Sequence, residues 1–139
     1  MRVYLDSSAL IKRALTETES VDLRDAVDGH TRRNDLLMSS ALGTVEVSRV
    51  LRSRLDDESP QYVTDLVELA LGGVAECALS SQVIGIARRL GPGSLRSLDA
   101  IHLATASIVA ADVVIAYDER LLRAASELGF RTASPGVAA

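Results

Sequence analysis

Residues 2–6 read Arg2-Val3-Tyr4-Leu5-Asp6, an apolar run that ends in an aspartate, and residues 113–118 repeat this form as Val113-Val114-Ile115-Ala116-Tyr117-Asp118. Both runs have the composition of strands buried in a sheet. In open parallel α/β sheets, functional sites form outside the carboxyl ends of the strands. We therefore expect Asp6 and Asp118 to point into one crevice if their strands are neighbours.

Apolar runs alternate with segments of helical period along the rest of the chain. We expect strands near residues 2–5, 35–39, 74–79, 112–117 and 130–133. We expect helices near residues 8–16, 19–29, 41–55, 60–72, 81–90, 97–110 and 119–128. This alternation predicts an α/β fold with a central, mainly parallel sheet of four to five strands flanked by helices.

Length and composition bound the number of domains and the compartment. With 139 residues, 47% of them hydrophobic, the chain is long enough for one well-packed domain and too short for two ordinary ones. We place the domain at residues 1–134 and expect residues 135–139 to form a short flexible tail.

Cys77 is the only cysteine and no charged-then-apolar leader precedes the first strand, so we expect a cytoplasmic protein. Charged residues interrupt the most apolar stretch, residues 98–117, so we expect no membrane span.

The net charge of −4 argues at first against a nucleic-acid partner, because a basic surface usually meets the phosphate backbone. If four acidic residues bind a metal, however, the remaining 15 acidic residues balance the 15 basic ones. Local basic patches then matter more than the total charge. The candidate patches are Lys12 with Arg13, Arg32 with Arg33, and the group Arg49, Arg52 and Arg54. A solvated helix face is the alternative interpretation of each patch.

Four acidic residues stand beside apolar segments where a fold could gather them: Asp6, Glu46, Asp99 and Asp118. Each also has a simpler interpretation. Asp6 and Asp118 could cap the helices that follow them, Asp99 could complement a helix dipole, and Glu46 could pair with Arg49 within its helix. Carboxylates that are brought together repel one another unless a cation holds them. A cluster of all four would therefore indicate a divalent metal, and oxygen ligands without thiolates or paired histidines favour Mg²⁺ or Mn²⁺.

Two further residues lie close to these acids in the sequence. His102 shares a helix face with Asp99 and could touch the site, but a buried histidine with satisfied hydrogen bonds is the favoured interpretation. Arg96 precedes the same helix and is a candidate phosphate contact, with an ordinary surface arginine as the alternative.

Four pieces of the sequence together resemble a PIN-domain ribonuclease, most closely a VapC-type toxin of a type II toxin-antitoxin system. They are Val3-Tyr4-Leu5-Asp6-Ser7-Ser8-Ala9-Leu10-Ile11, Thr44-Val45-Glu46-Val47, Leu98-Asp99-Ala100-Ile101-His102-Leu103-Ala104-Thr105-Ala106 and Tyr117-Asp118-Glu119-Arg120-Leu121. The likeness runs in the expected order from the first strand to Phe130. The resemblance implies a single PIN-like domain in which Asp6, Glu46, Asp99 and Asp118 are the metal-binding and catalytic acids.

The resemblance also implies the chemistry and the partners. The expected activity is Mg²⁺-dependent hydrolysis of RNA phosphodiester bonds by a metal-activated water, with Mn²⁺ as a substitute. The expected substrate is a structured RNA, tRNA or ribosomal RNA, cut at few positions, and the expected partners are a VapB-type antitoxin and a second copy of the chain in a homodimer. Ser8 matches a hydroxyl near the metal-bound waters. The family often has Thr or Ser two residues before the last aspartate. This chain has Ala116 there, which has no hydroxyl to supply a hydrogen bond around the site.

Three other functions fit parts of the pattern. A phospho-receiver domain has a similar length and fold, but it needs a lysine at the end of its last strand, and Lys12 is the only lysine. A non-catalytic PIN-like module that binds RNA or protein would fit the charge balance and Ala116. A DNA nuclease would use the same metal chemistry, which does not itself require a 2′-hydroxyl group. An extended base-stacking platform is not expected, because only 3% of the residues are aromatic.

Overall fold

The computed structural model describes residues 1–138, so residue 139 of the expected tail lies outside the described residues. Within them, five strands form one sheet in the order β3-β2-β1-β4-β5, and every neighbouring pair is parallel. The strands are β1 (Arg2–Leu5), β2 (Leu36–Ser40), β3 (Val74–Cys77), β4 (Val113–Ile115) and β5 (Arg131–Ala133). The helices are α1 (Ser7–Ala14), α2 (Ser20–Arg32), α3 (Ala41–Arg54), α4 (Pro60–Leu71), α5 (Ser81–Ala87), α6 (Ser97–Ile108) and α7 (Glu119–Glu127). The predicted α/β fold with a parallel sheet is confirmed.

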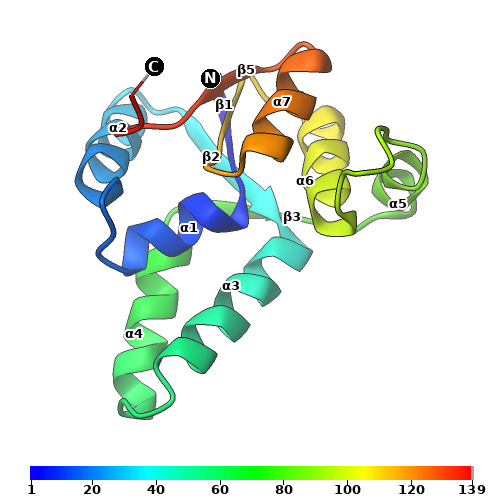
Figure 1. Ribbon diagram of the computed structural model, residues 1–139. Helices are drawn as coiled ribbons and strands as arrows, with labels where there is room; N and C mark the ends of the chain where they lie inside the picture. The colour runs from blue at the N-terminus through cyan, green and yellow to red at the C-terminus, as the bar shows by residue number, and fades with distance from the viewer. Residues whose placement is uncertain (139) are drawn as a thin grey trace.

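Helices cover both faces of the sheet (Figure 1). Alternate side chains of each strand point to opposite faces, and they build two separate cores. Val3 and Leu5 pack with side chains of α1, α2, α3 and α4. Tyr4 and Val114 pack with side chains of α6 and α7 on the other face. Because both faces of β1 and β4 are buried, these two strands are apolar at every position except Arg2.

Two pairs of helices extend beyond these cores. Figure 1 shows α3 and α4 as an antiparallel pair that projects away from the sheet, while α5 packs on the outside of α6. Val47 and Leu51 of α3 are fully buried and face the core. α4 begins at Pro60 after Ser59, whose hydroxyl accepts a hydrogen bond from the backbone N–H of Tyr62. Among the described residues, no helix is long and apolar enough to traverse a bilayer.

The predicted elements differ from the observed ones mainly at their ends. β3 stops at Cys77, before the expected end at residue 79, because its partner strand β2 ends at Ser40, where α3 takes over. α5 stops at Ala87 because the N–H of Arg89 bonds to the carbonyl of Ile86, three residues earlier, which tightens the last turn.

The start of the expected tail is attached to the domain. The hydroxyl of Tyr117 donates to the carbonyl of Pro135 over 2.7 Å. The N–H of Val137 donates to the carbonyl of Ser134 over 3.0 Å. The domain boundary at residue 134 and the flexibility of the tail stay predictions.

Candidate active site

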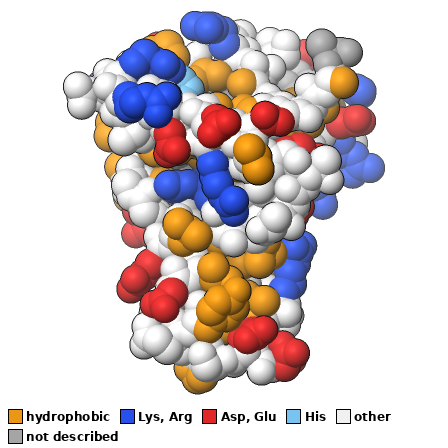
Figure 2. All heavy atoms as spheres, turned by 90° about the vertical axis from the view of Figure 1, so that its left-hand side faces the viewer, with side chains coloured by type: hydrophobic (Ala, Val, Ile, Leu, Met, Phe, Trp, Pro, Cys, Tyr) orange, Lys and Arg blue, Asp and Glu red, His pale blue; other side chains and the backbone are white. Residues whose placement is uncertain are grey.

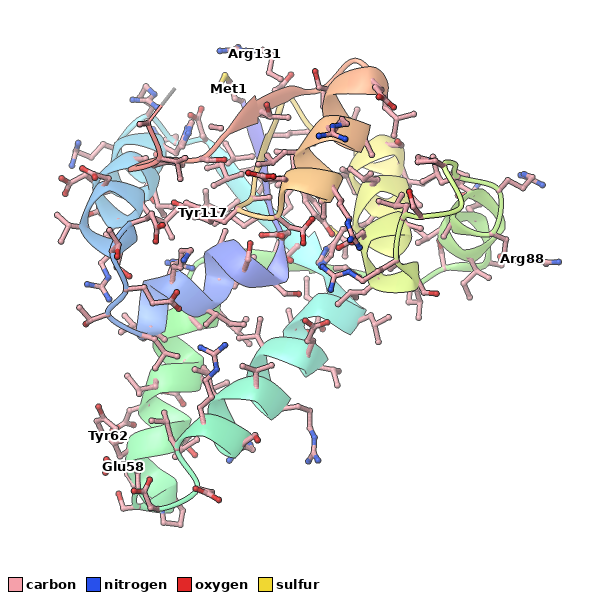
Figure 3. The ribbon with its side chains drawn as sticks, in the orientation of Figure 1. Met1, Glu58, Tyr62, Arg88, Tyr117 and Arg131 are labelled. Atoms are coloured by element: carbon pink, nitrogen blue, oxygen red, sulfur yellow. The ribbon has the colours of Figure 1, made fainter. Side chains whose placement is uncertain are left out.

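The carboxyl ends of β1 and β4 form the floor of the candidate site, because these strands are neighbours in the sheet. Asp6 follows β1 directly, and Asp118 lies shortly after β4. The backbone N–H of Asp6 donates to the carbonyl of Ile115 over 3.2 Å, which ties the two strand ends together. Tyr117, labelled in Figure 3, marks the chain just before Asp118, above α1 in that view. The sheet therefore brings the two aspartates to one edge.

The Asp6 carboxylate is almost completely buried and caps α1. Its Oδ1 accepts the backbone N–H of Ala9 over 2.9 Å and the hydroxyl of Ser8 over 2.6 Å. The Ser8 hydroxyl oxygen in turn accepts the N–H of Tyr117 over 3.1 Å, so one side chain joins the β1–α1 turn to the segment that leaves β4. Burial, and after it repulsion from two neighbouring carboxylates, raises the pKa of Asp6 to about 6.

Those two carboxylates belong to Asp99 and Asp118. Asp99 is the third residue of α6 and is buried, and burial followed by repulsion from Asp118 raises its pKa. Asp118 caps α7, because its Oδ1 accepts the N–H of Arg120 over 2.9 Å and the N–H of Leu121 over 3.0 Å. The fold thus gathers Asp6, Asp99 and Asp118 closely enough for their charges to interact.

Arg96 connects two of these acids. Its Nη2 donates to Oδ2 of Asp118 over 2.6 Å, and its Nε donates to Oδ2 of Asp99 over 3.4 Å. Arg96 is the N-cap residue of α6, but its side chain makes no capping hydrogen bond. The guanidinium therefore offsets part of the negative charge of the cluster from its solvent side, where 63% of the Arg96 side chain is exposed.

Glu46 approaches the same cluster from α3. Burial raises its pKa, and the nearby charge of Asp99 raises it further, while Arg96 opposes the shift. Among the salt bridges of residues 1–138, none joins Glu46 to Arg49, so the simpler intrahelical interpretation is not realised. Glu46 lies within electrostatic reach of Asp99, at the margin of the three aspartates.

Comparison with protein families assigns the chain to a known family. A family model described as "PIN domain" matches residues 3–127. The chain belongs to the PIN-domain family. The match includes all four acids, Asp6, Glu46, Asp99 and Asp118, and the predicted family is confirmed.

This PIN domain is similar to curated proteins over nearly its whole length. Ribonuclease VapC47 of Mycobacterium tuberculosis is 38% identical over 136 residues, which cover 96% of this chain and 97% of the relative. Ribonuclease VapC46 of the same organism is 36% identical over 135 residues, with 96% and 97% covered. Ribonuclease VapC35, also from M. tuberculosis, is 34% identical over 140 residues, with 98% of each chain covered. The predicted resemblance to VapC-type proteins is confirmed.

Solved structures share the fold of this PIN domain. M. tuberculosis VapC20, described as a sarcin-ricin loop cleaving toxin, superposes with a TM-score of 0.69 at 14% identity, over 92% of this chain and 95% of that chain. VapBC2 from Rickettsia felis, bound to a DNA fragment from its promoter, gives a TM-score of 0.72 at 9% identity, over 96% and 98%. At such low identities, the likeness establishes the fold alone.

The acids of this PIN domain suit a hard cation chemically. They offer carboxylate oxygens, which Mg²⁺ and Mn²⁺ prefer. Both side-chain hydrogen bonds of Asp6 within residues 1–138 go to Oδ1, which leaves Oδ2 for a further ligand. In the described part of the chain, however, no three side chains of Asp, Glu, His or Cys converge on one metal position. The donor set therefore fits a divalent metal, whereas the side chains of Asp99 and Asp118 are arranged around Arg96.

A buried hydrogen-bond chain lies under the β1–α1 turn of the PIN domain, and sequence reasoning missed most of it. The hydroxyl of Tyr4 lies 2.7 Å from Nδ1 of His102, and Nε2 of His102 lies 3.0 Å from the hydroxyl of Ser7. Burial lowers the pKa of His102 to about 4, so the ring is neutral near pH 7. The interpretation of His102 as a satisfied, buried histidine is confirmed. The missed signal was the pair of hydroxyl residues, Tyr4 and Ser7, that flank Leu5 and Asp6.

One of the predicted basic patches, Lys12 with Arg13, makes contacts within the protein. Lys12 pairs with Glu17 over 2.8 Å and with Glu19 over 3.0 Å, and its Nζ lies 4.8 Å from the ring centroid of Tyr117. Nη1 of Arg13 donates to the carbonyl of Ala70 over 2.9 Å. On the face shown in Figure 2, basic and acidic side chains are interleaved rather than separated into a basic stripe. These contacts favour a structural role for Lys12 and Arg13.

Two open hollows meet at Tyr117 and Asp118. Arg96 and Arg120 line one of them, together with Glu119. The other is lined by Ser8, Ile11, Lys12, Glu17 and Arg54 in addition to the two shared residues. Asp118 is therefore reachable from two sides along the surface.

Proposed function

We propose that this PIN domain is a Mg²⁺-dependent endoribonuclease, with Mn²⁺ able to replace Mg²⁺, that acts as the toxin of a toxin-antitoxin pair. The observation that carries this proposal is that the fold brings Asp6, Asp99 and Asp118 close enough for their charges to repel one another, which contributes to the raised pKa values of Asp6 and Asp99. Such a cluster lowers stability unless a cation offsets it. The full-length similarity to proteins named as VapC ribonucleases supports RNA as the substrate.

The side chains of the cluster would have different roles in this reaction. Asp6, Asp99 and Asp118 would hold the ion, and Glu46 would complete the site from α3. A bound divalent ion lowers the pKa of water and offsets the charge that develops on the phosphate. Glu46, at the margin with a raised pKa, would orient the attacking water or accept its proton. Ser8 holds Asp6 in position through its 2.6 Å hydrogen bond.

The surface around the cluster supports a structured RNA, tRNA or ribosomal RNA, as the substrate. Aromatic residues make up only 3% of the chain, so selectivity would come from the shape and backbone of the RNA rather than from base stacking. The two hollows that meet at Asp118 would let an RNA strand pass beside this aspartate. Arg96, exposed at the rim, would contact a phosphate through its guanidinium.

The proposal includes partners. A VapB-type antitoxin that blocks the site is supported by the similarity to VapC proteins and by the fold shared with the R. felis VapBC2 complex. A homodimer and a cytoplasmic location belong to the same proposal.

The test is cleavage of total cellular RNA by the purified protein with Mg²⁺, with Mn²⁺ and with EDTA. The Asp6→Asn variant removes one negative charge from the cluster while its amide oxygen can still cap α1. The Asp65→Asn variant makes the same chemical change at an exposed position of α4 and serves as the matched control. Single-stranded DNA of matching sequence is tested in parallel.

Discrete RNA fragments that disappear with EDTA and with Asp6→Asn, but persist with Asp65→Asn, are the expected result. Intact RNA under every condition, from a protein that unfolds cooperatively, would overturn the catalytic proposal in favour of a non-catalytic PIN-like module. Equal cleavage of the DNA would instead indicate a nuclease that does not distinguish ribose from deoxyribose.

A further inference from the structure

Arg96 holds together two acids that the proposed function assigns to the metal. Its two contacts use different nitrogens, Nη2 to Asp118 and Nε to Asp99, and both reach the Oδ2 atoms of those aspartates. Oδ1 of Asp118 is engaged in capping α7. The guanidinium therefore occupies the very oxygen of Asp118 that remains for a metal.

We infer that Arg96 is an internal counter-ion that competes with the divalent cation for Asp99 and Asp118, so that the cation binds only as the guanidinium leaves. This inference rests on the proposed metal-dependent function and adds a role for one residue of this chain. Competition explains two observations together. Three carboxylates interact with one another, yet no three of the described Asp, Glu, His or Cys side chains converge on one metal position.

The position of Arg96 in α6 supports a role outside helix formation. The N-cap of a helix favours Ser, Thr, Asp or Asn, and a positive charge is unfavourable at the positive end of the helix dipole. Arg96 occupies this N-cap and makes no capping bond there. The carboxylates of Asp99 and Asp118, rather than backbone groups at the end of α6, accept the hydrogen bonds of this side chain.

Release of the guanidinium has a consequence for the substrate. The Arg96 side chain is 63% exposed and lines the open hollow beside Asp118, so it can turn outward without disturbing the cores. Once displaced, it is free to form a charge-assisted hydrogen bond with a phosphate. Metal entry and phosphate binding are thereby coupled through one arginine, and by linkage each should strengthen the other.

The test measures Mn²⁺ binding by titration calorimetry and by the electron paramagnetic resonance of free Mn²⁺, without RNA. Arg96→Gln removes the two contacts and one positive charge. Arg120→Gln removes the same charge from the same rim, where Arg120 acts on Asp99 only through space and forms no salt bridge among the described residues. A second measurement uses the wild-type protein: the ¹⁵N–¹H signal of Arg96 Nε is followed during titration with diamagnetic Mg²⁺.

We expect Arg96→Gln to bind Mn²⁺ about tenfold more tightly than the wild type, and Arg120→Gln to stay within about threefold of it, in the range of coupling between sites that share a contact. We also expect the Arg96 Nε signal to shift, and its Nε–H proton to exchange faster with water, as Mg²⁺ saturates the protein. Equal affinities of the two variants, or an unchanged Arg96 signal at saturation, would overturn the inference while leaving the metal-dependent function intact. Mn²⁺ binding by none of the three proteins would overturn both.

Discussion

At the scale of single residues, capping a helix and binding the proposed metal would use different oxygens of the same aspartate. Oδ1 of Asp6 caps α1, and Oδ1 of Asp118 caps α7. In both aspartates, Oδ2 takes no part in the cap. Oδ2 of Asp118 contacts Arg96 instead. The two interpretations of these aspartates are therefore compatible, because the cap engages one carboxylate oxygen and leaves the other outside the helix end.

Substitution of Asp6 by asparagine should stabilise the metal-free protein. The folded-state pKa of about 6 lies above the ordinary value of 3.8, so the stability that Asp6 contributes is present below pH 3.8 and is lost as the pH rises through about 6. At pH 7.5 in EDTA, we expect Asp6→Asn to raise the free energy of unfolding by about 2 kcal/mol. Urea denaturation measures the change, which should shrink toward pH 4. A variant that is less stable than the wild type at pH 7.5 would contradict this account.

His102 should make the protein sensitive to acid. Its folded-state pKa of about 4 lies below the ordinary value of 6.5, so its contribution to stability is present above pH 6.5 and is lost as the pH falls toward 4. Because Asp6 acts in the opposite direction over much of this window, the effect is best measured in the Asp6→Asn background. There we expect a loss of roughly 2–3 kcal/mol between pH 7 and pH 4.5 in urea denaturation. Addition of His102→Gln should flatten the profile, and an unchanged slope would show that another group titrates.

At the scale of elements, α3 can approach α6 closely because its third residue is a glycine. A Cβ atom at Gly43 would lie 2.7 Å from Cε1 of His102, a ring that is held on both sides by hydrogen bonds. We expect Gly43→Ala to lower the free energy of unfolding by about 1–3 kcal/mol, since the buried ring has no room to move. Gly85→Ala is the matched control in α5, where a Cβ atom meets nothing within 4 Å. The control should gain about 0.5–1 kcal/mol from helix propensity, and a Gly43→Ala variant as stable as the control would refute the close contact.

The elements themselves were predictable because their signals are local. Apolar runs and helical period identified each strand and helix of the described residues. The contacts of Arg96 were not predictable, because an arginine before a helix reads as a surface residue until the sheet order places Asp118 beside it. The same holds for Ser7 and Tyr4, whose partner His102 lies more than 90 residues away along the chain. What sequence reasoning missed are side-chain contacts between distant segments.

At the scale of the whole molecule, the four acids come from separate parts of the chain. Asp6 follows β1, Glu46 lies in α3, Asp99 in α6, and Asp118 precedes α7. An ion bound by these side chains would link segments more than 100 residues apart along the chain, and only the folded protein gathers them. Metal binding should therefore stabilise the entire domain rather than a local loop.

This linkage predicts a metal-dependent rise in the melting temperature. A ligand at 100 times its Kd adds about 2.7 kcal/mol to the free energy of unfolding, which for a domain of this size corresponds to roughly 10 °C. We expect Mn²⁺ at that concentration to raise the melting temperature of the wild type and of Asp65→Asn by about this amount, as measured by circular dichroism. Asp6→Asn should show a much smaller rise although it starts from a more stable metal-free state. An equal rise in all three proteins would place the bound Mn²⁺ outside the acidic cluster, because only Asp6→Asn alters the carboxylates that the ion would link.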